Sequence, residues 1–500
     1  MLKSITSKPA PFIIVHCLVW WAMTVIAKPI LDSYGDMIEV YAWSQHWLAG
    51  SDKHPQFLPW LTNIWFLVAP QSFASFYLLS ALNLAVALFG IMALGRALKL
   101  GEMQVLVALA LSTLALPYLT LPGKLNMNAI CLATWPWTAW AFVRAVSEPQ
   151  KLRLLYAALF GLLAALSVLG KYYSVVLLIP LFAYTLMPRQ LWLWKTGAPW
   201  LAIVVFLAAL TPHLIWLAEH REALAYASEQ GAGDDLGRAI YYIAKFAVAP
   251  LFYWPLPLLL ACLLFVSGSL LARGRKLLRW PQAMPLLGVS ALGPWLVTLL
   301  FAFAGLAELS TPWAIPIGFA FTLYLVANAE PQLLERNGPK LMRAFHVFWP
   351  ALIAGAIVLA AIRGQAAETD YYMPDEEAAV AAVEHWHSKH EMPLSWVASG
   401  KGAAFISFFS PRPIEALPGL PNGLPSYYPA RENWQAEAGM MLCSLLPAGN
   451  VDGTCLQNIR DWAAANNMQS EEAVLTVKRS GLQFPREVPF DLTVVYVWPK

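Results

Sequence analysis

The feature that most constrains this chain is a succession of long apolar runs separated by short polar turns. Runs of about 16–22 apolar residues are long enough to cross a bilayer as helices. About eleven such runs occur, near residues 10–29, 73–95, 104–120, 128–146, 152–169, 172–187, 197–217, 251–272, 283–304, 312–328 and 344–362. The pattern predicts an α-helical polytopic membrane protein.

The composition supports this interpretation. Of the 500 residues, 59% are hydrophobic and 13% are charged, which is about half the charged fraction of a soluble protein. The net charge is only +3, and the basic residues are dispersed between apolar runs, so a nucleic-acid-binding surface is not expected. No P-loop, GxSxG, HExxH or CxxC motif occurs, so the sequence gives no support for ATP hydrolysis, serine hydrolysis or zinc chemistry.

The positions of lysine and arginine predict the orientation in the membrane. Cytoplasmic loops carry an excess of basic residues close to the spans. One face of the predicted bundle receives most of them: Lys3, Lys8, Arg96, Lys99, Arg144, Lys151, Arg153, Arg189, Lys195, Arg273, Arg275, Lys276, Arg279, Arg336, Lys340 and Arg343. We therefore expect a multi-pass protein of the bacterial inner membrane with a cytoplasmic N-terminus. The loops 30–72 and 218–250, the second ending in an amphipathic segment, and the chain after Arg363 are expected on the outer face.

The composition changes after Arg363, where the apolar runs shorten and acidic residues, glycine and proline appear. We predict a transmembrane domain over residues 1–363 and a soluble periplasmic α/β domain over residues 364–500. The expected strands are 394–398, 440–445, 473–477 and 492–498, and the expected helices are 376–389, 403–409 and 456–466.

The five cysteines fall into two groups. Cys17, Cys131 and Cys262 lie inside apolar runs and are expected to be small core residues. Cys443 and Cys455 lie in the C-terminal domain with a glycine-containing loop between them. In an oxidising compartment we expect them to form a disulfide, because a metal site would need more ligands.

The outer loop from Asp32 to Trp60 concentrates acids, a histidine and aromatic residues between apolar runs. If residues 35–48 are helical, Asp36 and Glu39 lie on one face beside Trp43, one turn further on. Asp36 is the candidate catalytic base. Asp32 is its rival, and it is also placed to cap the following helix. Glu39 is expected to position the acceptor or the loop. The apolar run 57–68 is too short to span and is expected to lie at the interface.

Cationic and polar residues at the predicted outer ends of the spans form a second set of candidates. Lys171 is expected either to bind phosphate or to extend to the headgroups as an interfacial lysine. Lys124 is a candidate for phosphate binding, and the alternative is that it lies in a solvated loop without a role. His54 is also a candidate, and the alternative is that it is an exposed histidine without a role. His213 and Glu308 either orient a sugar or cap a helix.

These residues resemble a known family. The stretch GDMIEVYAWSQHWLAGSDKHPQFLPW is similar to the first outer loop of the GT-C glycosyltransferases related to protein O-mannosyltransferases and to the lipid A aminoarabinose transferase. Asp36, Ser44-Gln45-His46 and His54-Pro55 match that loop. The segments GLLAALSVLGKYYSVVLLIP and NMNAICLATWPWTAWAFVRA extend the resemblance over about the first 330 residues. Met37 and Gln56 depart from the family pattern, and Met37 argues against a paired-acid or metal mechanism.

The resemblance implies an inverting transfer of a sugar from a polyprenyl-phosphate donor to an acceptor at the outer face of the membrane, without a cofactor or metal. The acceptor is lipid A, lipopolysaccharide or another envelope glycan, lipid or protein. Asp36 would accept the proton of the acceptor hydroxyl. The remaining residues would bind the donor phosphate (Lys171, His54, Lys124), contact sugar or lipid (Tyr172, His213, Trp43) and position the acceptor (Glu39, Glu308).

The alternative is a flippase or transporter of a lipid-linked sugar. A transporter is expected to show internal repeats and broken spans with charged residues at the membrane midplane. No such repeat is apparent in the sequence, and the ionisable residues gather at one face.

Overall fold

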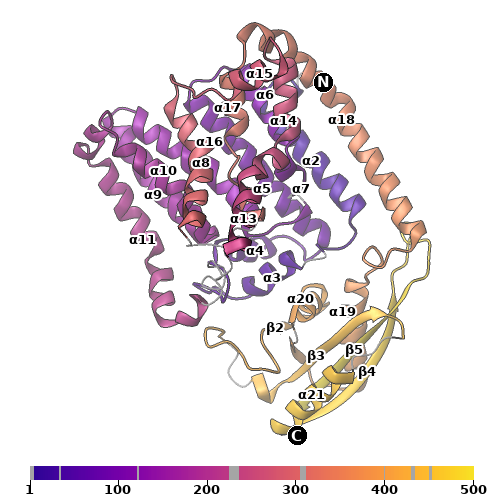
Figure 1. Cartoon of the computed structure of the whole chain (residues 1–500). Coiled ribbons are helices and arrows are strands. Elements are labelled where there is room, and N and C mark those ends of the chain that lie inside the picture. Colours follow the sequence, from indigo (N-terminus) through magenta and orange to yellow (C-terminus); the bar gives the residue numbers. More distant parts are fainter. Residues whose placement is uncertain are drawn as a thin grey trace. The chain divides into compact units, whose positions relative to one another are not determined.

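The computed structural model describes residues 5–32, 35–120, 123–224, 236–304, 311–398, 400–429, 434–449 and 453–500. The chain divides into two compact units (Figure 1). The helical unit comprises Met1–Ala22, Ala49–Leu58 and Leu78–Ile353. The sheet unit comprises Met23–Leu48, Pro59–Tyr77 and Ala354–Lys500. Part of the loop that the sequence predicts on the outer face thus belongs to the same unit as the C-terminal sheet.

Within the described residues, six helices are long and apolar enough to cross a membrane. They are α2 (Pro9–Ala27), α5 (Phe73–Ala97), α9 (Gln150–Gly170), α11 (Ala198–Glu219), α16 (Pro285–Phe303) and α18 (Pro331–Ala366). The predicted α-helical membrane fold is confirmed. The count of about eleven spans stays a prediction, because the other apolar runs form helices of varied length.

One of the breaks between those other helices lies at a proline, which has no backbone N–H to donate. Trp254 separates α13 (Leu236–Tyr253) from α14 (Pro255–Leu264), which begins with proline. The remaining helices are α3 (Asp36–Ser44), α4 (Phe57–Phe66), α6 (Glu102–Thr113), α7 (Leu116–Thr120), α8 (Met127–Ser147), η2 (Tyr172–Ser174), α10 (Val175–Thr185), η3 (Leu191–Lys195), η4 (Arg221–Leu224), α15 (Leu270–Leu277), η5 (Thr311–Ala314) and α17 (Phe321–Ala327).

Small residues allow α8, α9 and α11 to pack closely in the helical unit. Ala145, Ala157, Ala198 and Ala202 form a buried cluster. A side chain at Gly161 would meet the backbone of α11, because a Cβ there would lie 2.3 Å from the carbonyl oxygen of Ala202. Close approach through small residues is the usual way in which helices associate in lipid. This packing fixes α9, whose C-terminal end carries Lys171.

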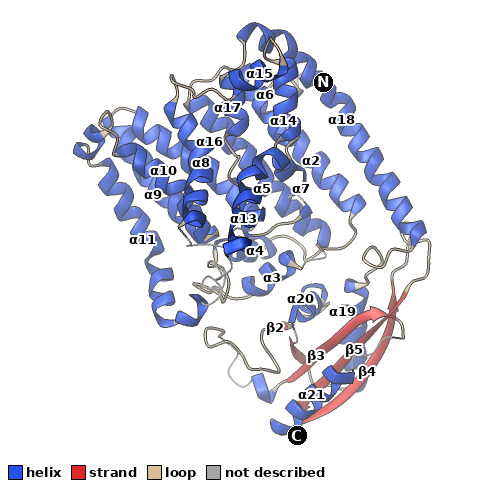
Figure 2. Cartoon of the chain, in the orientation of Figure 1, coloured by secondary structure: helices blue, strands red, loops and turns tan. Residues whose placement is uncertain are grey.

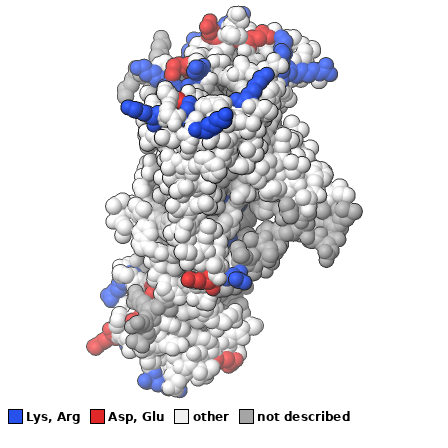
Figure 3. Space-filling view, turned by 90° about the vertical axis from the view of Figure 1, so that its left-hand side faces the viewer, with Lys and Arg blue, Asp and Glu red and all other residues white. Residues whose placement is uncertain are grey.

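The surface of the helical unit separates charged from apolar side chains. Lysine and arginine gather at the end that holds α15, and the adjoining surface is almost free of charge (Figure 3). Large apolar side chains are exposed on the helices there, among them Leu155, Val204 and Leu300, each at least 60% exposed. Such a surface is expected to contact lipid.

The sheet unit is built on five strands in the order β2-β1-β3-β5-β4 (Figure 2). The strands are β1 (Leu394–Ala398), β2 (Glu415–Leu417), β3 (Ala438–Pro447), β4 (Met468–Lys478) and β5 (Pro489–Pro499). β1 pairs in parallel with β2 and β3, and β5 runs antiparallel to β3 and β4. The four predicted strands are confirmed. β2 is an additional strand of three residues, too short to give a pattern.

Helices α19 (Asp375–Lys389), α20 (Gly400–Phe409) and α21 (Gly453–Ala465) accompany the sheet, as predicted, with the short η6 (Trp434–Ala436). β5 is buried from Phe490 to Val497, so both of its faces are covered. The outer-loop helices join this core through aromatic contacts. The ring of Phe408 on α20 lies 4.8 Å from that of Tyr41 on α3 and 5.3 Å from that of Phe66 on α4.

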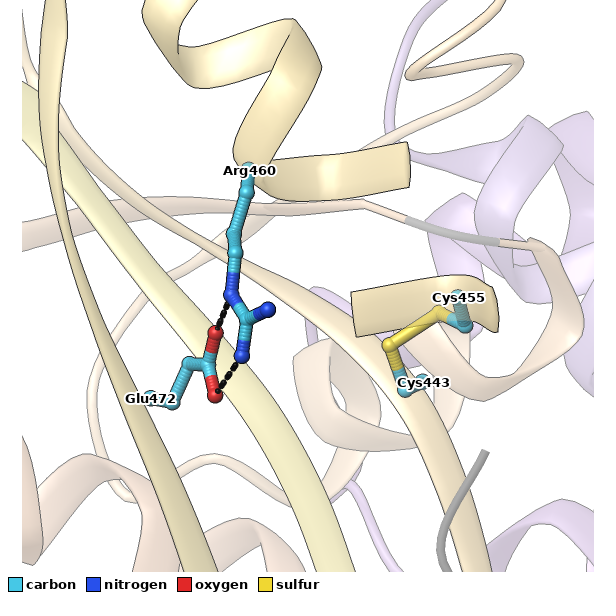
Figure 4. Close-up of a disulfide and its surroundings, with 4 residues drawn as sticks. All are labelled: Cys443, Cys455, Arg460 and Glu472. Atoms are coloured by element: carbon cyan, nitrogen blue, oxygen red, sulfur yellow. Dashed lines mark hydrogen bonds and ion pairs between the residues drawn. A yellow bond between two sulfur atoms is a disulfide. The ribbon is translucent and has the colours of Figure 1, made fainter. Parts of the chain in front are cut away.

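A disulfide joins β3 to α21. Cys443 on the strand and Cys455 on the helix are bonded, with a sequence separation of 12 residues (Figure 4). In the same figure, Arg460 on α21 forms a two-pronged ion pair with Glu472 on β4. The helix is thus tied to the sheet at two points.

Removal of this disulfide is expected to destabilise the sheet unit by about 3 kcal/mol, because the crosslink limits the freedom of the unfolded chain. We expect Cys455→Ser to unfold at lower denaturant concentration than the native protein under oxidising conditions. Under reducing conditions the two proteins should become equal. Equal stability of both proteins without reductant would contradict this expectation.

Candidate active site

Lys171 stands at the junction of α9 and η2 in the helical unit. Its backbone is extended (φ −164°), so that the chain leaves α9 and turns into η2. The side chain is only 9% exposed. Its Nζ donates a hydrogen bond of 2.5 Å to Oδ1 of Asn128 and lies 5.7 Å from the ring centroid of Trp313. An interfacial lysine would extend into the headgroups, whereas this ammonium is held inside the unit.

The first turn of α8 supplies the partner of Lys171. Oδ1 of Asn126 accepts hydrogen bonds from the backbone N–H groups of Asn128 (3.0 Å) and Ala129 (3.1 Å) and so caps the helix. The cap thus fixes the backbone of Asn128 at the start of the helix. Lys124 lies two residues before Asn126 and is half-buried. The turn that holds Lys124 therefore ends in the cap of α8, and the phosphate-binding role of Lys124 stays a prediction.

Tyr172 and His213, both predicted as sugar or lipid contacts, are bonded to each other. Nδ1 of His213 donates to the carbonyl oxygen of Ala49 (2.6 Å). In the neutral ring Nε2 is then the acceptor for the Tyr172 hydroxyl at 2.8 Å. This chain of bonds connects η2, α11 and the start of the 49–55 turn.

His54 lies in the same turn, residues 49–55, which packs against α11. The backbone N–H and hydroxyl of Ser51 donate to the carbonyl oxygen of His54 at 3.2 and 3.0 Å and close the turn. Gly50 is in contact with Trp216, since a Cβ at Gly50 would lie 2.1 Å from its ring. Four predicted residues, Lys171, Tyr172, His213 and His54, thus lie on segments tied together within the helical unit.

In the sheet unit, Asp32 and Asp36 differ in their hydrogen bonds and in their positions relative to α3. The two carboxylate oxygens of the buried Asp32 accept hydrogen bonds of 2.9 Å from the backbone N–H groups of Asp36 and Met37, at the start of α3. Both carboxylate oxygens of Asp32 are thus used to bind the N-terminus of α3. Asp36 is the first residue of α3 and is half-buried. A carboxylate is the type of group that can accept the proton of an attacking hydroxyl as a general base.

The helix α3 ends at Ser44, earlier than the predicted range 35–48, and Gln45 caps it. Met37, Ile38, Val40, Tyr41 and Ser44 are buried. Asp36, Glu39 and Trp43 lie together on the other face of the helix, which is half-buried, as the spacing predicted.

Glu308, the remaining candidate for positioning the acceptor, lies outside the described residues. Among the residues that are described, no group of three or more His, Cys, Asp or Glu side chains is arranged to hold a metal ion.

The hydrogen bonds that follow α3 were not predicted from the sequence. Nε2 of Gln45 donates to the hydroxyl of Ser407 (2.6 Å), and its Oε1 accepts from the backbone N–H of Ala416 (2.9 Å). Nε2 of His46 lies 2.8 Å from Oε1 of the buried Glu415. Gln45 and His46 belong to the stretch that resembles the family, but their partners lie more than 360 positions away in the sequence.

Comparison with known proteins identifies the fold of the chain. The family model for dolichyl-phosphate-mannose-protein mannosyltransferases matches residues 53–216. A crystal structure of ArnT from Cupriavidus metallidurans bound to undecaprenyl phosphate superposes with a TM-score of 0.58 at 11% identity, covering 96% of this chain and 97% of that chain. The apo structure of the same protein gives a TM-score of 0.58 at 12% identity, with 97% of each chain covered. No curated protein matches in a sequence search.

The chain is therefore a membrane protein with the fold of the GT-C glycosyltransferases and a small C-terminal sheet domain. Residues 53–216 are similar to the mannosyltransferases named above, and this match confirms the resemblance that was stated from the sequence.

Proposed function

We propose that the protein transfers a sugar from a polyprenyl-phosphate donor to an acceptor of the cell envelope, at the outer face of the bacterial inner membrane. The observation that carries the proposal is Lys171, a buried ammonium held by Asn128 at the end of a membrane-length helix. A fixed cation with little access to water suits a phosphate that gains negative charge as the sugar leaves. The ArnT structure with undecaprenyl phosphate shows that one protein of this fold accepts such a lipid.

The proposed reaction is a single inverting displacement. The acceptor hydroxyl attacks the anomeric carbon while Asp36 takes up its proton. The bond between that carbon and the phosphate oxygen breaks, and the polyprenyl phosphate leaves with the bonding electrons. Lys171 neutralises the leaving phosphate, with His54 and Lys124 as additional cationic candidates. Tyr172 and His213 are proposed to contact the sugar or the lipid.

Mass spectrometry of envelope glycolipids tests this function in cells. We expect cells that produce the protein to contain a glycolipid that is heavier by one sugar residue than its counterpart in cells without it. Cells that produce Asp36→Asn provide the matched control and should resemble cells without the protein. The same glycolipid pattern in all three strains, together with an altered distribution of the lipid-linked sugar between leaflets, would favour the flippase instead.

A further inference from the structure

A polar cavity lies entirely within the sheet unit. It has a volume of about 460 Å³ and is lined by Tyr41, Gln45, His46, Ser407, Arg412 and Glu415, among others. Its volume is in the range of small-ligand sites. The lining side chains come from the end of α3 and the residue after it, from Gln71 before α5, from α20, and from the loop that leads into β2 with the first residue of that strand.

The cavity wall is held in place by its own hydrogen bonds. Ser407 receives the bond from Gln45 and donates to the carbonyl oxygen of Ile414 at 2.6 Å. The Tyr428 hydroxyl donates to Glu415 at 2.9 Å and lies 3.1 Å from Nε2 of His46. Side chains fixed in this way lose little conformational entropy when a ligand binds.

The chemistry of the lining indicates a ligand rich in hydroxyl groups. Amide, hydroxyl, imidazole and carboxylate groups surround one space, so donors and acceptors alternate at short range. These groups already bond to one another, but carboxylate, amide and hydroxyl oxygens each keep a further lone pair that can accept from a ligand hydroxyl. A sugar offers hydroxyls that act as donor and acceptor at once.

Arg412 adds a positive charge at this cavity. It is exposed, and its Nη1 lies 3.3 Å from Nε2 of His387. Burial and the guanidinium lower the pKa of His387, so the imidazole stays neutral at pH 7 and can accept that bond. Within the described part of the chain, no carboxylate forms an ion pair with Arg412. The guanidinium is therefore available to an anionic group.

We propose that this cavity binds an acidic saccharide, a sugar unit that carries a carboxylate or phosphate. Arg412 binds the anionic group, and the residues around Gln45, Ser407 and Glu415 bind the hydroxyls. Identification of this sugar as part of the acceptor rests on the proposed function. The binding itself does not depend on transfer.

Saturation-transfer NMR on the full-length protein in nanodiscs tests the site with digalacturonic acid as the probe. Its methyl ester keeps the hydroxyls and removes the charge. We expect the ester to bind about tenfold more weakly, the loss typical of one charge-assisted hydrogen bond. Arg412→Ala should lower the affinity for the acid to that for the ester. Arg460→Ala, which removes another exposed arginine of the same unit, should change neither affinity.

Three results would overturn the proposal. The acid and the ester could bind equally well, or neither could bind. Inorganic phosphate could displace the acid at equal concentration, which would indicate a simple anion site. Finally, Arg460→Ala could lower the affinity for digalacturonic acid as much as Arg412→Ala does. Each of these results leaves the sugar-transfer reaction unaffected, so failure of this inference is distinguishable from failure of the proposed function.

Discussion

Asp36→Asn is expected to lower the rate of sugar transfer by about 10²–10⁴-fold, the usual contribution of a general base. Asparagine keeps the size of aspartate but cannot take up a proton at neutral pH. Because the bond between Asp32 and the start of α3 uses the backbone N–H of residue 36, the substitution should leave the helix intact. Donor binding and thermal stability should stay near those of the native protein. The measurement is the rate of transfer from a synthetic polyprenyl-phosphate sugar.

Two neighbouring carboxylates provide matched controls. Glu39→Gln changes the same face of α3 and should cost less activity. Asp32→Asn loses one of two charge-assisted acceptors for the helix N-terminus, so it should lower the melting temperature along with the rate. Near-normal turnover by Asp36→Asn would end its assignment as the base. If only Asp32→Asn lost sugar-transfer activity, and its stability were unchanged, Asp32 would be the base instead.

Removal of the charge at Lys171 is expected to weaken donor binding by about 10–100-fold, since a charge-assisted hydrogen bond contributes about 1.5–3 kcal/mol. The side chain is buried, so Lys171→Ala would also leave space behind. Lys171→Met fills that space without the charge and is the cleaner test. Donor affinity in nanodiscs is the measurement.

Lys124→Met serves as the comparison, because Lys124 lies two residues before Asn126, which caps the helix of Asn128. We expect a smaller loss of donor affinity there than at Lys171. If Lys171→Met retained full donor affinity but unfolded more readily, the lysine would be a structural partner of Asn128 and the phosphate assignment would be wrong.

The features that sequence predicted best are those that depend on local pattern. Apolar length located the helices, and alternation located the strands of the C-terminal domain. Cys443 and Cys455 are separated by only 12 residues in a domain expected outside the cytoplasm, and these two features sufficed to predict their disulfide. The capping role of Asp32 was also within reach, because a carboxylate just before a helix is a common start signal.

What sequence could not predict depends on contacts between distant segments. Nothing in the pattern of α3 shows that Tyr41 packs on Phe408 or that His46 pairs with Glu415. Those contacts place the helix of Asp36 in the sheet unit, together with residues 354–500. Periodicity also gave no reason for α3 to end at Ser44, where Gln45 bonds instead to Ser407 and to the backbone of Ala416.

The most direct test of the proposed transfer uses the purified protein in nanodiscs with a polyprenyl-phosphate sugar and an envelope glycolipid extract as the source of acceptor. The native protein should release free polyprenyl phosphate and add one sugar to a component of the extract, with inversion at the anomeric carbon. Asp36→Asn should do neither at a comparable rate. If the native protein instead moved the intact lipid-linked sugar between the leaflets of vesicles and released no polyprenyl phosphate, the protein would be a transporter and the proposed transfer reaction would be contradicted.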